Sequence, residues 1–351
     1  MELKEILGEA MQRGASDVHV LAGLPPILRI NTELIQSDRP VVTKEEAIEL
    51  VRQMVGPRRY AQFMRRRDLD FSTELPGSGR FRVNAHFQHE SVAIAFRAIP
   101  TKVPPIAKLN LPPVVSTFTD LPRGLVLVTG ETGSGKSTTL AAMIDAMNHK
   151  FNYHVITLED PVEYELKGDK CLIEQREVGQ DVPSFASGLR HVLRQDPDII
   201  LVGEMRDLET TSAAITAAET GHLVLSTLHT QSAAQTVERI VDIYPAEQQN
   251  QIRAMLANTL QAVISQTLFK RLDGKGMVPA AEVLVCTSAV RACIREARAY
   301  EIPNVIQTGA AKGMISLDSS IKSLFLNGYI SREDAIGRAT TRDSLTQALS
   351  A

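Results

Sequence analysis

The feature that most constrains this chain is a glycine-rich stretch, Gly130-Glu131-Thr132-Gly133-Ser134-Gly135-Lys136-Ser137-Thr138. Two glycines bracket four residues and are followed by Lys and Ser, which is the pattern of a phosphate-binding loop. An unbroken apolar run, 125–128, precedes the stretch, and apolar residues at helical spacing follow it over 140–147. The sequence therefore predicts a strand, a phosphate-binding turn and a helix in that order.

A turn of this kind holds polyphosphates. Its glycines let successive backbone N–H groups point at one spot, and the helix N-terminus adds partial positive charge. Lys136 is predicted to reach the β- and γ-phosphates, and the hydroxyl of Ser137 is predicted to ligate Mg²⁺. We therefore expect ATP and Mg²⁺ as cofactors, with the nucleotide in contact with the whole stretch from Gly130 to Thr138.

Acidic residues follow the next predicted strand, 154–158. Glu159, Asp160 and Glu163 come directly after it, at the edge where open α/β sheets place their ligands. We expect Glu159 and Asp160 to bind the nucleotide. Glu163 is a candidate for activating the attacking water, and metal or ribose binding is its alternative role.

A further buried strand is predicted at 199–202, and Gly203 and Glu204 come directly after it. The second motif of most P-loop ATPases has an Asp where this chain has Gly203, so the usual acidic support for Mg²⁺ is missing. Glu204 is the nearest carboxylate and is predicted to contact Mg²⁺, directly or through water. Glu204 and Glu163 are the two candidates for the catalytic base, and the sequence does not rank them.

The stretch 221–230 contains another predicted buried strand, which ends near His229. A histidine beside the phosphates can hydrogen-bond the γ-phosphate or sense its loss. A structural histidine with satisfied hydrogen bonds is the alternative interpretation.

Two arginines are predicted to share one face of a hairpin in the first hundred residues. Arg80–Gln88 alternates apolar and polar residues, and a partner strand is predicted at 92–96. Arg82 and Arg97 then project from the polar face, where they can complement a phosphate supplied from elsewhere. Exposed strand charges without a ligand are the alternative.

Composition limits the class of partner and the compartment. The 351 residues carry a net charge of -3, which gives no electrostatic reason to expect nucleic acid. The three cysteines, Cys171, Cys286 and Cys293, form no C-x-x-C pair, as suits a reducing cytoplasm. The charged start of the chain argues against a signal peptide, and any membrane association is expected to run through a partner.

The chain is predicted to divide into four segments. Prolines are concentrated between residues 100 and 122, which indicates a linker. Strands alternate with helices after it, as a parallel sheet requires. From Gln251 onward the pattern turns helical and stays so, with no further acidic residues at strand ends. The predicted segments are an N-terminal domain (1–103), a linker (104–122), a nucleotide-binding core (123–270) and a mostly helical C-terminal region (271–351).

Together, these segments resemble the secretion-superfamily ATPases, and among them the type IV pilus retraction ATPases. The resemblance runs almost from end to end. Its motifs are Gly14–Asp17, Arg80–Asn84, Pro122–Gly124, the phosphate loop, Glu159–Glu163 (the Asp box), Gly203–Asp207 (an atypical Walker B motif) and Thr220–Thr230 (the His box). The glycine at position 203 is itself characteristic of that family.

The resemblance implies an α/β protein with a PAS-like α+β N-terminal domain and a RecA-like P-loop ATPase domain, assembled as a homohexamer. ATP would lie between the two domains of one subunit. Arg82 and Arg97 would act as arginine fingers, and His222 of the His box would help to bind the nucleotide.

The implied function is ATP hydrolysis that powers pilus retraction and twitching motility. The implied location is cytoplasmic, at the inner membrane through a platform protein, and paralogous pilus ATPases are further candidate partners. The stretch Ala289–Glu296 resembles the family's A-I-R-N-L-I-R-E retraction signature but departs from it at Val290, Ala292 and Cys293. An accessory retraction ATPase is therefore an alternative.

Three further classes of protein have weaker support in the sequence. Pilus assembly and type II secretion ATPases usually carry a tetracysteine zinc module and a longer N-terminal region. A nucleotide-switched binding module or GTPase would need a guanine-reading N-K-x-D segment, which the chain lacks. A RecA-like DNA motor would bind DNA in a salt-sensitive way, which the acidic balance disfavours.

Overall fold

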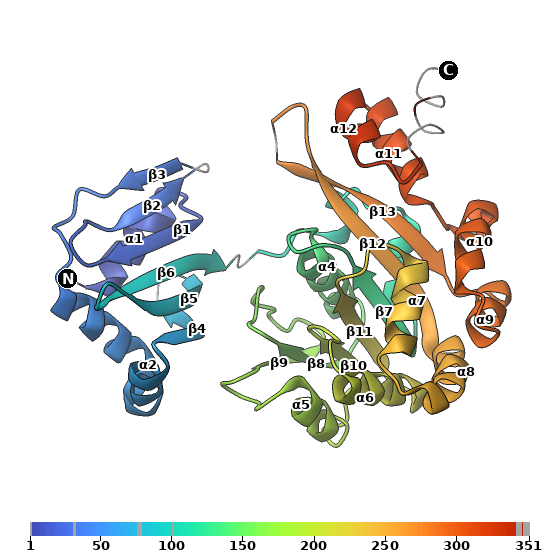
Figure 1. The fold of residues 1–351 in the computed structure, drawn as a ribbon, viewed down its shortest axis with the longest axis horizontal. Coiled ribbons are helices and arrows are strands. Elements are labelled where there is room, and N and C mark those ends of the chain that lie inside the picture. Colours follow the sequence, from blue (N-terminus) through green and yellow to red (C-terminus); the bar gives the residue numbers. More distant parts are fainter. Residues whose placement is uncertain are drawn as a thin grey trace. The chain divides into compact units, whose positions relative to one another are not determined.

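The computed structural model describes residues 2–30, 33–75, 79–99, 102–274, 276–341 and 346. The chain divides into two compact units. The first comprises Met1–Lys102 and Pro161–Glu165, and the second comprises Val103–Asp160 and Leu166–Ala351. Each unit has its own sheet (Figure 1). Each also has its own apolar core. The predicted α/β class, with an N-terminal sheet domain and a parallel-sheet ATPase domain, is confirmed.

The first unit is built on an antiparallel sheet of six strands in the order β3-β2-β1-β6-β5-β4. The strands are β1 (Asp17–Leu21), β2 (Ile27–Ile30), β3 (Glu33–Gln36), β4 (Asp68–Leu75), β5 (Gly79–Gln88) and β6 (Ser91–Ile99). The predicted hairpin is β5–β6, and its alternation of apolar and polar residues sets the register. Arg82 on β5 lies directly opposite Arg97 on β6.

Two helices contribute to the core of the first unit. They are α1 (Leu3–Gln12) and α2 (Lys44–Arg66). Thr43 caps α2, because its hydroxyl accepts the N–H of Glu46 while the Glu46 carboxylate accepts the N–H of Thr43. The helix is kinked at Gly56, where φ is 69° and Pro57 follows.

The second unit is built on a sheet of seven strands in the order β13-β12-β7-β11-β10-β8-β9. The strands are β7 (Gly124–Thr129), β8 (His154–Glu159), β9 (Leu172–Glu177), β10 (Ile199–Val202), β11 (Leu223–Leu228), β12 (Leu260–Lys270) and β13 (Met277–Val285). All neighbours are parallel except β12 and β13, which form an antiparallel hairpin. The carboxyl ends of β7, β8, β10 and β11 therefore meet at one edge of the sheet.

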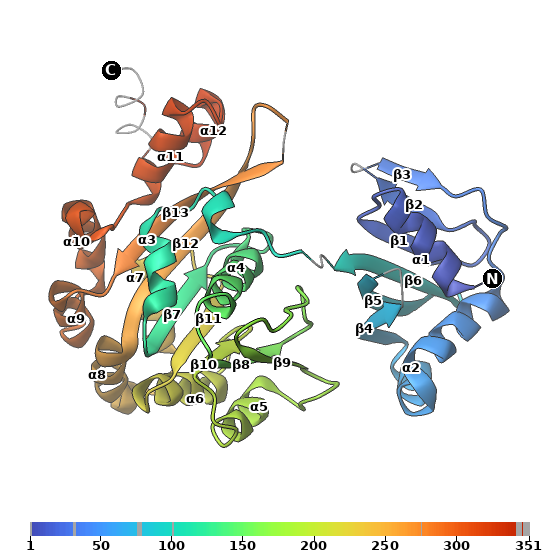
Figure 2. The same cartoon turned by 180° about the vertical axis from the view of Figure 1, so that it is seen from behind.

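Helices cover both faces of this sheet, as Figures 1 and 2 show from opposite sides. They are α3 (Val114–Thr117), α4 (Lys136–Asn148), α5 (Phe185–Val192), α6 (Leu208–Glu219), α7 (Ala233–Asp242), α8 (Gln249–Thr259), α9 (Ser288–Arg295), α10 (Ile302–Thr308), α11 (Leu317–Leu326) and α12 (Arg332–Gly337). One face packs Val126 and Val128 against α3 and α4. The other packs Leu125 and Leu127 against α5, α6, α7 and α8.

Short 3₁₀ turns link several of these elements. They lie at Ile106–Lys108, Phe118–Asp120, Ala246–Gln248, Ala299–Glu301 and Ala310–Lys312. The segment predicted as a linker, 104–122, packs on the second unit, since Val115 and Phe118 are buried in the core beneath α4. It is therefore part of that unit's structure for much of its length.

The prediction of a helical pattern from Gln251 onward is wrong for residues 260–285. This stretch forms β12 and β13, which extend the sheet beyond β7. The hairpin crosses the predicted boundary at residue 270, so the nucleotide-binding unit continues past it. The helices α9 to α12 follow the hairpin, as the C-terminal part of the prediction requires.

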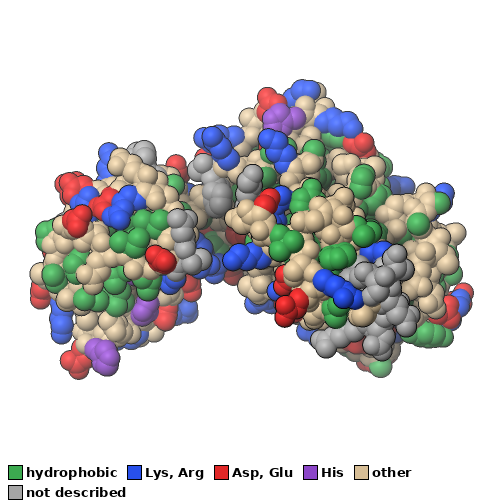
Figure 3. All heavy atoms as spheres, turned by 90° about the horizontal axis from the view of Figure 1, so that it is seen from above, with side chains coloured by type: hydrophobic (Ala, Val, Ile, Leu, Met, Phe, Trp, Pro, Cys, Tyr) green, Lys and Arg blue, Asp and Glu red, His purple; other side chains and the backbone are tan. Residues whose placement is uncertain are grey.

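Surface charge is mixed on the face that Figure 3 shows, where acidic, basic and apolar side chains are interspersed among the described residues. In the part of the chain that the structure describes, no helix has both the length and the apolar character needed to cross a membrane.

Candidate functional site: the phosphate loop and the carboxyl edge of the sheet

The phosphate loop connects β7 to α4 through a tight glycine turn. Gly130, Gly133 and Gly135 have φ values of 137°, 79° and 89°, a region that side-chain-bearing residues rarely adopt. A Cβ at Gly130 would lie 2.3 Å from the backbone oxygen of Gln266 on β12 and 2.6 Å from Ser134 Oγ. Only glycine fits there, so the strand beneath the loop fixes its path.

The loop presents donors that suit an anion. Lys136 is 8% exposed, and its Nζ donates to the backbone oxygens of Gly130 and Glu131 at 2.9 and 2.8 Å. In the described chain, the N–H groups of Gly133 and Gly135 donate to no other backbone group. The Ser134 hydroxyl is buried without a hydrogen-bond partner among the described residues. These donors and the start of α4 form the kind of cradle that binds phosphate oxygens.

Glu204 and His229 come together beside this edge, although they follow different strands. Glu204 follows β10, and one of its carboxylate oxygens lies 3.5 Å from His229 Nε2 and 2.8 Å from Arg206 Nε. Pairing of β10 with β11 and of β11 with β7 brings these ends into one row. A carboxylate next to a histidine and an arginine is able to hold or move a proton.

The glycine at position 203 has a steric reason. A Cβ there would lie 3.2 Å from the Leu158 backbone oxygen and 3.3 Å from the ring atoms Cε1 and Cζ of Phe185. Hydrogen bonds hold Gly203 in place on both sides. Its N–H donates to the Leu158 backbone oxygen, and its own backbone oxygen accepts the hydroxyl of Thr227. The aspartate found at this position in ordinary P-loop ATPases would be crowded, which leaves Glu204 as the first carboxylate after β10.

The acidic residues after β8 are placed differently from one another. Glu159 accepts hydrogen bonds from Thr157 Oγ1 at 2.6 Å and Gln175 Nε2 at 3.0 Å, so one oxygen of its carboxylate is engaged within the sheet. Asp160 and Glu163 come just beyond the strand, and the side chain of Glu163 is exposed. These contacts do not rank Glu163 against Glu204.

His222, which was predicted to bind the nucleotide, lies at the opposite end of the sheet from the phosphate loop of the same chain. His222 immediately precedes β11, whereas the phosphate loop follows the opposite end of the parallel neighbour β7. Six strand residues separate the two ends, roughly 20 Å at 3.3 Å per residue. His222 Nδ1 instead lies 3.0 Å from the Ala217 oxygen at the end of α6.

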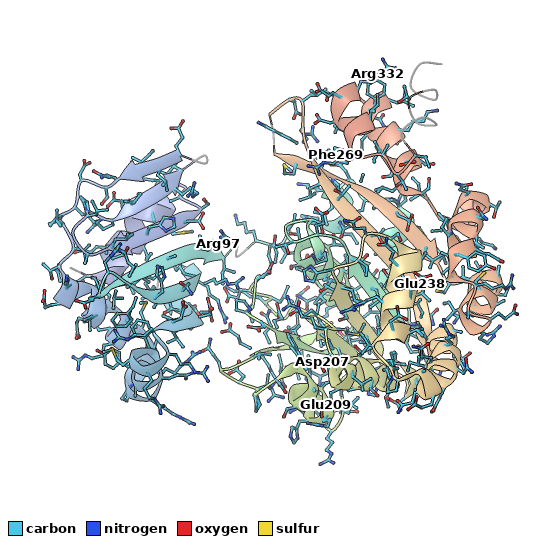
Figure 4. The ribbon with its side chains drawn as sticks, in the orientation of Figure 1. Arg97, Asp207, Glu209, Glu238, Phe269 and Arg332 are labelled. Carbon is cyan, nitrogen blue, oxygen red and sulfur yellow. The ribbon has the colours of Figure 1, made fainter. Side chains whose placement is uncertain are left out.

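Arg82 and Arg97 share one face of the first unit's sheet, as predicted. Arg97 Nε donates to Asp17 Oδ1 at 2.9 Å, and the Arg97 side chain remains 70% exposed (Figure 4). Partial burial tends to raise the pKa of Asp17, but hydrogen bonds from Arg97 and Ser16 more than offset it and leave that pKa below its ordinary value. Asp17 therefore stays ionised and keeps its ion pair with Arg97.

Sequence reasoning missed several polar residues at this edge. Gln231 Nε2 donates to Glu131 Oε1 at 3.0 Å, which connects the segment after β11 to the phosphate loop. Arg206 pairs with Glu204, and the Asp207 side chain caps α6 by accepting the N–H of Thr210 at 2.8 Å (Figure 4). Arg206 and Asp207 stand inside the atypical Walker B motif, so that motif was the available signal.

The residues present fit a magnesium ion that is shared with the nucleotide. No group of three or more His, Cys, Asp or Glu side chains able to hold a metal occurs among the described residues. Mg²⁺ commonly takes one or two protein oxygens and completes its shell with phosphates and water. Ser137, in the first turn of α4, and Glu204 carry side-chain oxygens that could serve as such ligands.

Comparison with known proteins identifies the family. Residues 106–318 match the family model described as type II/IV secretion system protein. The chain is 47% identical over 339 residues to the type IV pilus retraction ATPase PilT of Pseudomonas aeruginosa, covering 97% of this chain and 98% of that protein. This chain belongs to the type II/IV secretion system protein family.

Two further members of this secretion family help to place the chain within it. A crystal structure of the pilus retraction motor PilT with bound ADP is 43% identical, with a TM-score of 0.93 and coverage of 99% of both chains. The type IV pilus ATPase PilU of Pseudomonas aeruginosa is 36% identical over 345 residues, covering 98% of this chain and 90% of that protein. The predicted resemblance to the pilus retraction ATPases is confirmed, and so is the predicted enzyme class, an ATPase.

The departures from the retraction signature of this secretion family lie mostly in the core. The stretch forms α9, in which Val290 and Cys293 are buried against the face of the sheet that α7 and α8 cover. Both substitutions keep apolar side chains at packed positions. They therefore change core packing and leave the charged residues of the signature in place.

Proposed function

We propose that this protein is a motor subunit that hydrolyses ATP to power type IV pilus retraction, acting as a homohexamer. The end-to-end similarity to PilT, which covers both units, carries this proposal. Each unit of this chain has a matching part in PilT, so the similarity includes both the nucleotide site and the sheet that bears the two arginines.

In the proposed reaction the phosphate loop holds ATP through Lys136 and the backbone N–H groups of the glycine turn. Ser137, and Glu204 directly or through water, would hold Mg²⁺, which would neutralise phosphate charge. Glu204 orients the attacking water and accepts its proton. His229, 3.5 Å from that carboxylate, reads the γ-phosphate. Glu163 is the alternative base.

Arg82 and Arg97 supply positive charge to the γ-phosphate when the N-terminal unit closes. Their charge matters most in the transition state, because phosphoryl transfer is accelerated chiefly by positioning and charge neutralisation. Closure then depends on nucleotide state, since only a ligand with a γ-phosphate makes the extra contact. Sequential closure around a ring would turn a platform protein at the cytoplasmic face of the inner membrane.

A Lys136→Ala strain tests this function. We expect purified Lys136→Ala protein to lose ATP turnover by about 100-fold or more, because one phosphate-binding charge is removed. The strain should keep surface pili and lose twitching movement. Lys312→Ala removes an exposed lysine far along the chain and should change neither ATP turnover nor twitching movement. Loss of the pili themselves would instead favour a pilus assembly ATPase.

The base is assigned by a second pair of variants. Glu204→Gln and Glu163→Gln keep the shape of each side chain and remove its ability to accept a proton. If Glu204 is the base, Glu204→Gln binds ATP but does not turn it over, and Glu163→Gln retains turnover. The reverse pattern assigns the base to Glu163.

An accessory retraction role is the second candidate, and the 36% identity to PilU favours keeping it. Deleting the gene distinguishes the two roles. Complete loss of twitching indicates the principal retraction motor, whereas retained twitching that weakens under load indicates an accessory one.

A further inference from the structure

A row of polar side chains lies beneath the phosphate loop, on the face of the sheet that α7 covers. Thr129 ends β7 and pairs with Ser265 on β12, which in turn pairs with Glu282 on β13. The Thr129 hydroxyl donates to Ser265 Oγ at 2.8 Å, and both residues are buried. Paired residues on neighbouring strands point to the same face, so Glu282 extends this row away from the loop.

Glu282 holds the beginning of α7. Its Oε1 accepts the N–H of Ala233, the first residue of the helix, at 2.8 Å. The first N–H groups of a helix have no partner within the helix, and a carboxylate there is favoured by the helix dipole. Burial nevertheless raises the pKa of Glu282, and the charge of Asp318 raises it further, against the lowering effect of the Ala233 N–H. Glu282 therefore stands at a position where the ionised form of its carboxyl group is costly.

The segment held in this way borders the phosphate loop. His229 lies 3.5 Å from Glu204, and Gln231 donates to Glu131 at 3.0 Å. Thr230 is tied to the body of α7 by a 2.7 Å hydrogen bond with Thr236. The four residues His229–Ser232 thus connect the end of β11 to α7, and their path is set by where α7 begins.

We propose that Glu282 is a positioning residue, which fixes the start of α7 and thereby holds His229 and Gln231 at the γ-phosphate side of the phosphate loop. The inference rests on the proposed role of His229. Glu282 would act through α7 and not by a contact of its own with nucleotide or metal. Its effect should therefore appear as discrimination between ATP and ADP, which differ only in the γ-phosphate.

The test compares the affinities of full-length variants for ADP and for a non-hydrolysable ATP analogue. Glu282→Met keeps the side-chain length and removes the acceptor, and it should weaken analogue binding about fivefold to tenfold while ADP binding changes little. Glu282→Gln retains an acceptor and should restore the wild-type ratio. Glu238→Met on the exposed side of the same helix (Figure 4) is the matched control and should leave the ratio unchanged.

A variant of the donor separates positioning from a folding defect. Ala233→Pro removes the N–H that Glu282 accepts, and proline is tolerated at the first residue of a helix. The preceding residue, Ser232, is already extended, with φ of -145° and ψ of 162°, as a residue before proline should be. This variant should show the same selective loss of analogue affinity, even if Glu282→Met fails to fold.

His229→Ala distinguishes failure of this inference from failure of the proposed function. It should lower the analogue affinity, and Glu282→Met should have a smaller effect in that background than in the wild type, because only the positioning of Gln231 is left to lose. If His229→Ala leaves the ratio unchanged, the proposed role of His229 falls, and this inference falls with it. If His229→Ala changes the ratio but Glu282→Met and Ala233→Pro weaken both nucleotides equally, Glu282 is only structural and this inference alone is overturned.

Discussion

Gly130 is the residue at which the phosphate loop is most tightly built. Gly130→Ala places a Cβ 2.3 Å from the Gln266 oxygen, so the loop or β12 has to move. Gly133→Ala is the matched control, because its φ is also positive but nothing lies within 4 Å of an added Cβ. We expect Gly133→Ala to cost about 1–2 kcal/mol from backbone strain alone. Gly130→Ala should cost about 2 kcal/mol more.

Urea unfolding of the two glycine variants measures this difference. Equal destabilisation would mean that the loop can shift away from β12 without loss. The strand beneath the loop would then not determine its path.

The buried thiol of Cys286 should make the free energy of unfolding depend on pH. Burial raises its pKa from 9.0 to about 12. The thiol is thus neutral in the folded protein while it ionises above pH 9 in the unfolded chain, so its contribution to stability is lost as pH rises. Relative to Cys286→Ala, the wild type should lose about 1.4 kcal/mol of unfolding free energy between pH 8 and pH 10. A difference between the two proteins that is constant over this range would contradict the burial of the thiol.

The site residues that could be predicted are those whose motif also fixes their position on the sheet. A glycine-rich turn after an apolar strand can only lie at the strand's carboxyl end. Glu204 and His229 likewise follow the carboxyl ends of β10 and β11, which are parallel to β7. His222 belongs to the same His box but stands before its strand, at the other end of the sheet, so membership of a motif does not by itself fix where a residue lies. Glu282 stands in no motif, and its role depends on a contact with Ala233, which is 49 residues away in the sequence.

Among the secondary-structure elements, α9 stabilises the junction of α8 and β12. Arg291 donates from α9 to the backbone oxygens of Ala257 and Asn258 and to Gln261 Oε1. The last carbonyls of a helix lack partners within it and attract positive charge. Arg291→Ala should therefore cost about 1–3 kcal/mol, because it leaves part-buried carbonyls unpaired.

Arg295→Ala is the control for this prediction, since Arg295 lies one turn later on the same helix and is exposed. Arg295→Ala should lower the free energy of unfolding by no more than about 0.5 kcal/mol. Thermal or urea unfolding of both variants measures the two losses of stability. A loss for Arg291→Ala as small as that for Arg295→Ala would show that water satisfies the end of α8.

The β12–β13 hairpin could not be predicted because nothing in the local sequence ends the helix before it. The helix α8 ends at Thr259 and the strand begins at Leu260, with neither Gly nor Pro between them. The strand is set instead by pairing with β7, which continues the apolar core on both sides. Periodicity in a window of sequence does not contain that partner.

In the whole molecule, catalysis is proposed to need charge from both units. Each unit has its own core, and the arginines stand on one sheet while the phosphate loop stands at the edge of the other. Arg82→Ala and Arg97→Ala should each lower ATP turnover by about 10³-fold or more, as loss of an arginine finger does. Both variants should bind ADP as the wild type does, because the proposed contact is with the γ-phosphate.

Arg52→Ala on α2 is the control for the arginine variants, since it removes an exposed arginine of the same unit that pairs with neighbouring Glu49. Arg97→Ala also breaks the contact with Asp17, whose side chain is 14% exposed, but Ser16 still donates to that carboxylate and Arg29 lies 3.9 Å from it, so the variant should stay folded. Steady-state turnover and ADP titration on the same preparations separate the two effects. A fall in turnover of less than about tenfold for both arginine variants would mean that neither is an arginine finger, and that hydrolysis proceeds without charge from the N-terminal unit.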